Sequence, residues 1–445
     1  MAFTDTLIAQ SDADVVLVDR RHRPGGHWLD AYPFVRLHMP SANYGVASRP
    51  LGGDRIDESG PNAGFYERAS AAAICEHFGR ALDEVLLPSG RVRFLAMTDY
   101  RGEEDGRHRL VSTLTGADTA VRVRRKLVDA TYVASSIPSR HRPGFEVGPG
   151  VRMIPPNDLV DLELPISRVT LIGAGKTAMD TCTWLLEAGV DPERIRWIRP
   201  RDGWFFERSY TQPLDLVARY MQMQAHWIEA AAEAEGGADF AHRLEERGVF
   251  IRIDPTVEPD LFRGATISVG EIESLHTVQH VVRKGKVRRL ESNRIWLDEG
   301  EEPAAPDELF VDCTAEGVPA TASRPVFETA RVTIEYVTMG IATWSAATVA
   351  AVECGPYDAD VKNKLCRPVV FSGSIKDVLD PVYAAMGGLV ARLREPALMA
   401  WDENCRLNPA RGATEHLDDP RVSDALASMM TNIGRALRNL KLRTA

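Results

Sequence analysis

The chain has 445 residues, with 53 Lys and Arg against 63 Asp and Glu, so its formal net charge is −10. This length is enough for two or three domains with sizeable cores, and an apolar fraction of 44% is ordinary for a globular protein. The acidic balance argues against a nucleic-acid partner, because phosphate binding needs a basic field.

The sequence carries no signature of a membrane span, a signal peptide or a metal site. The longest uncharged run, residues 336–352, is shorter and more polar than the roughly 20 apolar residues of a span. The N-terminus lacks the basic region of a signal peptide. The six cysteines are scattered, without a CxxC pair or a zinc spacing. These features predict a cytoplasmic chain with reduced thiols and no bound metal.

The N-terminal third predicts a helix, a buried strand and then a mixed region. Residues 1–10 have helical periodicity, and the β-branched run in 12–20 predicts a buried parallel strand that ends at Asp19. A Gly-rich loop follows. Residues 62–87 predict a helix, residues 91–133 several strands, and the prolines between 138 and 156 a linker.

A second strand–loop–helix–strand unit begins at residue 168. We expect a strand over 168–172, a loop over 173–178, a helix ending at Gly189 and a second strand over 194–202. Further along, the sequence predicts helices over 213–248, a hairpin over 277–297 with its turn at 284–286, a short strand over 307–314 and a mostly helical remainder.

The loop of this second unit has the G-x-G-x-x-A pattern of a dinucleotide site. Gly173 permits the tight turn, Gly175 lets a pyrophosphate approach the backbone, and Ala178 lets the helix pack on the strand, with Lys176 and Thr177 between them. The phosphates would lie at the positive end of the helix. The alternative is a Gly-rich turn in an α/β domain without a ligand.

The end of the following strand predicts which nucleotide is preferred. Arg199 lies 21 residues past Ala178, close to the usual spacing of about 20, and Arg201 follows. Because arginine accommodates a 2′-phosphate and we expect no acid at this strand end, the pattern favours NADP(H) over NAD(H). The alternative is that both arginines are solvated surface charges.

The N-terminal unit contains the second half of a similar pattern. Asp19 ends a strand that follows a helix, as the ribose-binding acid of a Rossmann unit does. The third glycine of such a fingerprint would then stand just before Met1, so the first strand and the phosphate loop are missing. We therefore expect Met1 to be an internal methionine with the native start upstream. The alternative is that Asp19 is only a strand-end acid.

The loop after Asp19 resembles the class B flavoprotein monooxygenases, which include flavin-containing and Baeyer–Villiger monooxygenases. The resemblance rests on the stretch Arg23-Pro24-Gly25-Gly26-His27-Trp28 and on its continuation through Tyr32 and Arg36 to Ser41 and Tyr44. It implies two Rossmann motifs, the first for FAD and the second for NADPH. It also implies FAD-binding roles, which fall on Asp19, Arg20, Gly25, Gly26, Trp28 and Arg36.

The sequence departs from that family at two further places. The family has a histidine shortly before the second Gly-rich loop, whereas residues 150–159 contain none. The family's Ala-Thr-Gly turn is replaced by Ala130-Thr131-Tyr132. Both departures weigh against the family's complete oxygenation chemistry.

These observations predict an α/β fold with two Rossmann-like dinucleotide-binding domains. The FAD-type domain is split into residues 1–160 and 306–445, the latter with C-terminal helices, and an NADP-binding domain over 165–305 is inserted into it. The favoured function is an NADPH-dependent flavoprotein oxidoreductase acting on a small molecule, with a monooxygenase as its more specific form. One alternative is a non-catalytic NADP(H)-binding sensor or scaffold that has lost flavin chemistry, and another is a simple NADPH dehydrogenase.

Other candidate residues have weaker signals, and no motif identifies a catalytic residue or an oligomeric state. His27 and His38 lie in the expected flavin loop and are structural or surface residues unless they take part in catalysis. The aromatic run 204–206 is either core packing or part of a substrate channel. The basic cluster 283–289 is most simply a solvated face of the expected hairpin.

Overall fold

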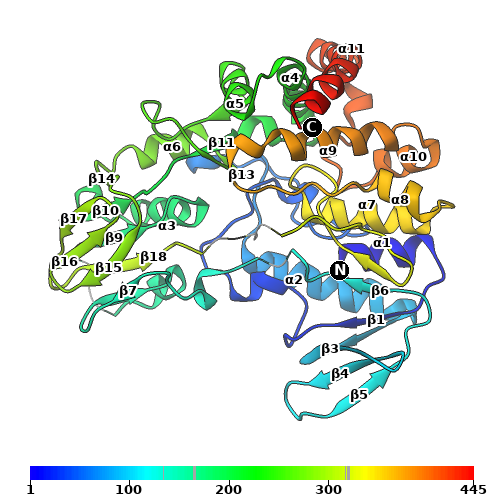
Figure 1. The fold of residues 1–445 in the computed structure, drawn as a ribbon, viewed down its shortest axis with the longest axis horizontal. Coiled ribbons are helices and arrows are strands. Elements are labelled where there is room, and N and C mark those ends of the chain that lie inside the picture. Colours follow the sequence, from blue (N-terminus) through cyan, green and yellow to red (C-terminus); the bar gives the residue numbers. More distant parts are fainter. Residues whose placement is uncertain (134, 164–166, 316, 318–320, 445) are drawn as a thin grey trace.

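The computed structural model describes residues 1–445 apart from 134, 164–166, 316, 318–320 and 445. Its largest sheet has five strands, which are β8 (Arg152–Ile154), β9 (Val169–Ile172), β10 (Ile195–Ile198), β14 (His280–Val282) and β18 (Leu309–Asp312). Their spatial order is β14-β10-β9-β18-β8, and every neighbouring pair is parallel. Figure 1 shows this sheet on the left of the molecule.

The order of four of these strands is that of a dinucleotide-binding sheet. The chain runs from β9 through helix α3 (Lys176–Glu187) to β10 and later reaches β14, and then returns to the other side of β9 as β18. The strand order therefore reverses beside β9, and ligands of open parallel sheets bind at such a switch point. All residues of β9, β10 and β18 are buried, as expected for near-continuous apolar runs covered on both faces.

Two sequence-based expectations about this sheet are wrong. The strand expected over 307–314 was assigned to the FAD-type part, but β18 lies between β9 and β8, so the sheet extends beyond residues 165–305 at both ends. The hairpin expected over 277–297 does not form either, because β14 completes the parallel sheet beside β10. The actual hairpin joins β15 (Val287–Glu291) to β16 (Arg294–Leu297), although Gly285 still makes a tight turn with φ of +74°.

The N-terminal unit contains two separate parallel pairs instead of one sheet. Strand β1 (Val15–Val18) pairs with β2 (Val92–Leu95), and β6 (Leu127–Asp129) pairs with β19 (Arg331–Thr333). Val16 in β1 is 40% exposed, which is unusual for a strand of this composition in a parallel sheet.

The remaining strands form small sheets around these units. One is an antiparallel meander at the bottom of Figure 1, a second places β11 between β12 and β13, and a third has the order β17-β16-β15-β7. Their bounds are β3 (Thr98–Glu104), β4 (Arg107–Ser112), β5 (Asp118–Val121), β7 (Glu146–Val147), β11 (Gly203–Glu207), β12 (Phe250–Ile251), β13 (Leu261–Ile267) and β17 (Gly300–Pro303).

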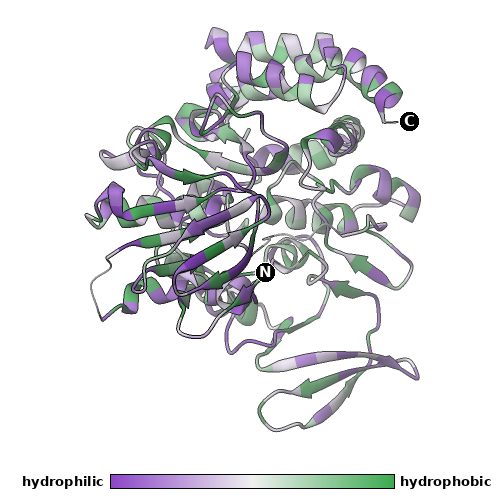
Figure 2. Ribbon diagram, turned by 60° about the vertical axis from the view of Figure 1, so that its left-hand side comes forward, coloured by the Kyte–Doolittle hydropathy of each residue, from purple (hydrophilic) through white to green (hydrophobic). Residues whose placement is uncertain are grey.

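Helices cover the N-terminal unit and build the C-terminal half. Helix α1 packs against α7, and the long C-terminal helix α11 packs along α4, with its hydrophobic face inward in Figure 2. Helix α2 is shorter than the expected 62–87, because residues before Ser70 form loops and bridges. The bounds are α1 (Ala2–Gln10), α2 (Ala71–Ala81), α4 (Val217–Glu233), α5 (Gly237–Glu246), α6 (Val269–Leu275), α7 (Ala342–Cys354), α8 (Ala359–Leu365), α9 (Leu379–Arg392), α10 (Pro396–Asn404) and α11 (Pro420–Arg443).

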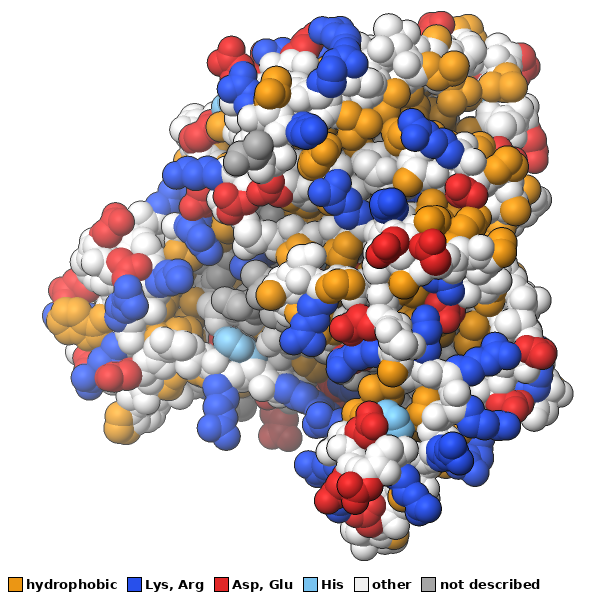
Figure 3. Space-filling view, turned by 45° about the vertical axis from the view of Figure 1, so that its right-hand side comes forward, with side chains coloured by type: hydrophobic (Ala, Val, Ile, Leu, Met, Phe, Trp, Pro, Cys, Tyr) orange, Lys and Arg blue, Asp and Glu red, His pale blue; other side chains and the backbone are white. Residues whose placement is uncertain are grey.

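The described helices include none with the length and apolar character that a bilayer crossing requires. On the face shown in Figure 3, acidic and basic side chains are interspersed. That face therefore presents no continuous basic field of the kind that nucleic-acid phosphates require.

The position of β18 makes its core residues essential for stability. Phe310 is 2% exposed and packs between the five-stranded sheet and the β15–β16 hairpin. We expect Phe310→Ala to lower the free energy of unfolding by about 3–5 kcal/mol, because it leaves a cavity in a central strand. Urea denaturation measures this loss. The control is Trp296→Ala at a 39% exposed position, and an equal loss in both variants would contradict the central placement of β18.

Candidate functional site

The turn between β9 and α3 can form only with glycine at its first position. Gly173 has φ of +130°, and a Cβ atom there would lie 2.8 Å from the carbonyl oxygen of Cys313. The Trp197 indole Nε1 donates a hydrogen bond of 2.7 Å to the Gly173 carbonyl. The turn is therefore locked between β10 and the end of β18, at the switch point of the sheet.

The other side of this turn is open. Gly175 is the N-cap of α3 in extended conformation, and a Cβ atom there would meet nothing within 4 Å. The first N–H groups of α3 lack partners within the helix, and with the helix dipole they favour an anion at this end. Ala178 is fully buried against the sheet, where a larger side chain would not fit. The residues of this turn thus fit a dinucleotide pyrophosphate.

The two arginines expected to bind a 2′-phosphate have different surroundings. Arg199 is 4% exposed, is ion-paired with Asp202 and lies 4.8 Å from the Trp197 ring centroid, so it is not a solvated charge. Asp202 also pairs with Arg283, which corrects the expectation that no acid stands at this strand end. Arg201 is 44% exposed with only a 3.9 Å contact to Asp260, so it is the more available of the two.

In the N-terminal unit, Asp19 lies at the end of β1, as expected. Its Oδ1 accepts a hydrogen bond of 2.9 Å from the backbone N–H of Arg21. Arg20 is 71% exposed and lies 4.0 Å from Asp99. Arg36 is exposed and donates to the carbonyl of Arg68. The two arginines therefore face outward, whereas Asp19 is held at the strand end.

The Gly25–Trp28 loop is tightly packed. Gly25 has φ of +143°, and a Cβ atom there would lie 3.0 Å from the Cys75 sulfur, while Gly26 has φ of +57°. The Trp28 Nε1 donates a hydrogen bond of 2.8 Å to the hydroxyl of Tyr44. Burial raises the pKa of Tyr44, so this hydroxyl stays protonated. The loop keeps one geometry and presents Trp28 beside Tyr44.

Arg406, in the C-terminal part of the chain, holds the segment 42–46, which carries Tyr44, the partner of Trp28. Arg406 donates hydrogen bonds to the carbonyls of Ala42, Tyr44 and Val46. Burial lowers the pKa of Arg406 to about 10, which still leaves it charged at neutral pH. Residue 406 stands in no motif, so sequence reasoning missed it.

Two features of the N-terminal unit match contacts expected for FAD. It offers the strand-end carboxylate of Asp19 and the Trp28 loop. The second unit, by contrast, contains both the turn and the following strand of a dinucleotide site.

A buried group of charged side chains connects the two units, and we call it the ion cluster. The hydroxyl of Tyr32 donates to Asp180 at 2.8 Å, and the Lys176 ammonium donates to Asp180 at 2.7 Å and to Glu271 at 3.3 Å. Arg208 donates to Glu271 at 2.6 Å, and Arg68 lies 3.7 Å from the same carboxylate. The members are Arg68, Lys176, Asp180, Arg208 and Glu271.

The ion cluster is electrostatically centred on Glu271. Burial alone would raise the pKa of this carboxyl, but Lys176, Arg208 and Arg68 outweigh burial and hold the pKa well below its usual range. Burial and the neighbouring Arg68 lower the pKa of Arg208 to about 10. Each member side chain is at most 13% exposed, so solvent screens these interactions little. Sequence reasoning singled out Lys176 alone among the members.

The structure also shows the surroundings of the aromatic run 204–206. Trp204 and Phe206 pack with Trp227, Phe250 and Phe262, so the aromatic run belongs to the core.

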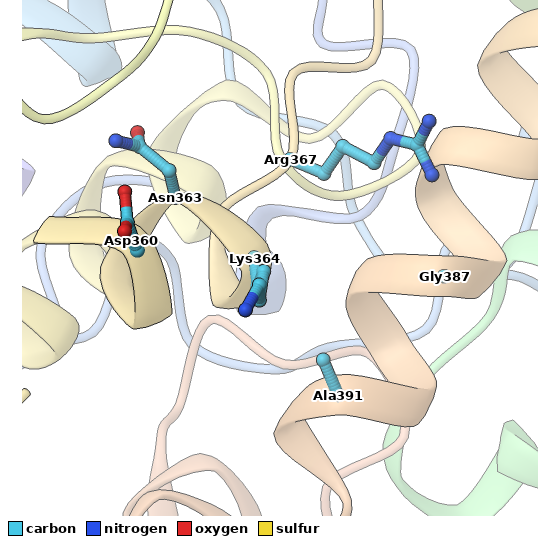
Figure 4. Close-up of a pocket in the computed structure, with 6 residues that line it drawn as sticks. All are labelled: Asp360, Asn363, Lys364, Arg367, Gly387 and Ala391. Atoms are coloured by element: carbon cyan, nitrogen blue, oxygen red, sulfur yellow. The ribbon is translucent and has the colours of Figure 1, made fainter.

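A hollow of about 520 Å³ between α8 and α9 is lined by polar side chains such as Asn363, Lys364 and Arg367 (Figure 4). None of its lining residues belongs to the two nucleotide units' loops.

Removal of the charge on Glu271 should destabilise the protein in a pH-dependent way. Glu271→Gln leaves three buried cations with one fewer carboxylate, and we expect the free energy of unfolding at pH 7 to fall by about 3–5 kcal/mol. Because the folded-state pKa of Glu271 is lowered, its stabilisation is complete above the ordinary value of 4.5, weakens as the pH falls below that value, and is lost only when the pH passes the folded-state pKa.

Urea denaturation at pH 7 and pH 4 tests this expectation. The difference between wild type and Glu271→Gln should shrink at the lower pH. The control is Glu273→Gln, an exposed position on the same helix, which should change stability by less than about 0.5 kcal/mol at either pH. A difference that does not depend on pH would mean that lost packing, and not lost charge, causes the effect.

Comparison with solved structures finds similar chains among flavoproteins, whereas no protein-family model matches. A flavin-containing monooxygenase from Stenotrophomonas maltophilia is 13% identical with a TM-score of 0.41, covering 90% of this chain and 95% of that chain. The cyclohexanone monooxygenase from Rhodococcus sp. Phi1 bound to NADP+ is 13% identical with a TM-score of 0.45, covering 79% and 82%.

Much closer sequence relatives occur in mycobacteria. An uncharacterized protein of Mycobacterium tuberculosis (strain ATCC 25618 / H37Rv) is 42% identical over 431 residues, which are 96% of this chain and 79% of that protein. An uncharacterized protein of Mycobacterium bovis (strain ATCC BAA-935 / AF2122/97) matches with the same identity and coverage. The chain therefore belongs to the family of these mycobacterial proteins.

Proposed function

We propose that this protein is an NADPH-dependent flavoprotein oxidoreductase of the monooxygenase type that acts on a small molecule. The observation that carries the proposal is the direct connection between the two expected nucleotide loops. Lys176 belongs to the Gly173–Ala178 turn and bonds to Asp180, which in turn accepts a hydrogen bond from Tyr32, four residues beyond Trp28. Oxidoreductases of this kind require two cofactors to meet at such a junction.

The residues of the second unit would bind and orient NADPH. The Gly173–Ala178 turn and the amino end of α3 would hold the pyrophosphate, and Arg201 is the residue available for a 2′-phosphate. Arg199 would act indirectly, since its ion pair with Asp202 fixes the strand end. The nicotinamide would supply a hydride, and the flavin would pass the electrons to oxygen or another acceptor.

The residues of the N-terminal unit would orient a flavin. Asp19 is placed for a ribose hydroxyl, while Gly25, Gly26 and Trp28 form a fixed wall that Tyr44 and Arg406 support. The ion cluster is bonded to Tyr32, four residues past Trp28, and would exclude water from the junction, because its members are buried and bonded to one another. No side chain of this set is assigned to the chemical step itself.

A non-catalytic NADP(H)-binding sensor or scaffold is the second candidate function. The observation in its favour is that residues 150–159, shortly before the second Gly-rich loop, contain no histidine, whereas the family that the N-terminal motifs resemble has one there. Such a protein would bind NADPH through the Gly173–Ala178 turn without bound flavin.

NADPH binding should depend on the open side of the turn. We expect Gly175→Val to lower NADPH affinity at least about tenfold, because its methyl groups occupy the space for the pyrophosphate, while thermal stability changes little. Calorimetric titration measures the affinity. The matched control is Gly236→Val, since Gly236 is also an extended N-cap with open space at its Cβ position. Equal affinities in the wild type and Gly175→Val would place NADPH elsewhere.

Flavin content and oxygen uptake distinguish the two candidate functions. For the oxidoreductase we expect purified protein to show the visible absorption of bound flavin, and NADPH to bleach it and then drive oxygen consumption. Versions of the protein with and without additional N-terminal residues test whether such residues increase flavin binding. A protein that binds NADPH and remains colourless in both versions would support the sensor.

A further inference from the structure

The hollow between α8 and α9 has two walls of different chemistry. The wall formed by α8 and the residues just after it carries polar and charged side chains, whereas α9 contributes only small residues. The lining residues are Asp360, Asn363, Lys364, Arg367, Gly387 and Ala391 (Figure 4). The volume of about 520 Å³ lies in the range of sites that hold small molecules.

Contacts with α9 hold the side chain of Arg367 and leave its N–H groups available. The guanidinium lies 4.8 Å from the centroid of the Tyr383 ring, a cation–π contact that uses no hydrogen-bond donor. Gly387 follows Tyr383 by one helical turn, and a Cβ atom at Gly387 would lie 3.4 Å from Nη1 of Arg367. The glycine thus leaves room for the guanidinium beside the hollow (Figure 4).

The wall formed by α8 is fixed by Asn363. Its Oδ1 accepts a hydrogen bond of 3.0 Å from the backbone N–H of Phe327, and its Nδ2 donates one of 2.8 Å to the carbonyl of the same residue. Lys362 of this helix is ion-paired with Glu353 at 2.7 Å. These contacts hold α8 in place, so the hollow is formed before any ligand arrives.

The two cations that line the hollow lack an acidic partner. Among the described residues, no carboxylate oxygen lies within ion-pairing distance of Lys364 or Arg367. Asp360 stands one helical turn before Lys364, yet the charged ends of these two side chains do not point toward one another (Figure 4). Two cations therefore face the hollow against one carboxylate, and their hydrogen-bond donors are available to a ligand.

From this arrangement we propose that the hollow binds a small molecule that carries a phosphate or carboxylate group. The guanidinium of Arg367 can donate two parallel hydrogen bonds to either anion, and the ammonium of Lys364 adds a further positive charge. Asp360 repels the anion and lowers its affinity without cancelling both cations. This site is separate from the loops of the two nucleotide units, and the proposal does not depend on the proposed function.

Equilibrium dialysis with radioactive inorganic phosphate at constant ionic strength tests the proposal. The variants are Arg367→Met, Lys364→Met, Asp360→Asn and, as the control, Lys441→Met. Lys441 is exposed on α11 and does not line the hollow. Phosphate bound at the Gly173–Ala178 turn would contribute equally to all of these proteins, so differences between them isolate the hollow.

We expect Arg367→Met to weaken phosphate binding about tenfold and Lys364→Met severalfold, because each loses a hydrogen bond from a charged group. Asp360→Asn should bind phosphate about twofold more tightly, since the repelling charge is removed. Lys441→Met should match the wild type. General damage to the fold cannot produce effects of opposite sign, and thermal unfolding checks that each variant is folded.

Equal phosphate affinities in the wild type, Arg367→Met and Lys364→Met would overturn the proposal. It would also be overturned if the wild type bound no phosphate at millimolar concentrations. Competition with unlabelled acetate distinguishes the two kinds of anion. Displacement of the phosphate by acetate would extend the site to carboxylates, and its failure would restrict the site to phosphates.

Discussion

One buried carboxylate, Glu271, constrains the arrangement of both units. Three cations converge on it from three different parts of the chain, and it also accepts the backbone N–H of Ser268 as part of the capping box that starts α6. Charges in such a place must be paired, because transfer from water costs several kcal/mol per ion. The helix start, the nucleotide turn and the N-terminal loops therefore cannot move independently of one another.

The parallel strands of the two units are arranged differently. Around β9 the sheet continues on both sides, and Gly173 is locked between Trp197 and Cys313. In the N-terminal unit the parallel strands form two separate pairs, and Val16 is exposed. The fixed parts of the N-terminal unit are instead its loops, which are held by side chains from distant segments. The unit around β9 is held together by its sheet. The N-terminal unit is held together by contacts between its loops and side chains from distant segments.

Local patterns were predictable from the sequence, whereas pairings between distant segments were not. The Gly173–Ala178 turn was expected because three small residues at fixed spacing meet a local steric need. The place of β18 was missed because its apolar run suits any buried parallel strand, and the 277–297 hairpin was expected because Gly285 signals a turn without showing what the flanking strands pair with. The partners of Arg199 and Lys176 could not be foreseen, since Asp202, Arg208 and Glu271 carry no motif.

The clamp that Arg406 places on the Ala42–Val46 backbone has a consequence for how this protein can be altered. Residues separated by some 360 positions in sequence share these hydrogen bonds, so the polypeptide downstream of α10 is part of the wall around Trp28. A frameshift or a protease cut before Arg406 would leave every glycine of both loops intact. It would nevertheless remove the hydrogen bonds that hold the backbone around Tyr44, and with them the support of Trp28. Mutations that truncate the protein before Arg406 should therefore have the same effect as mutations within about the first fifty residues.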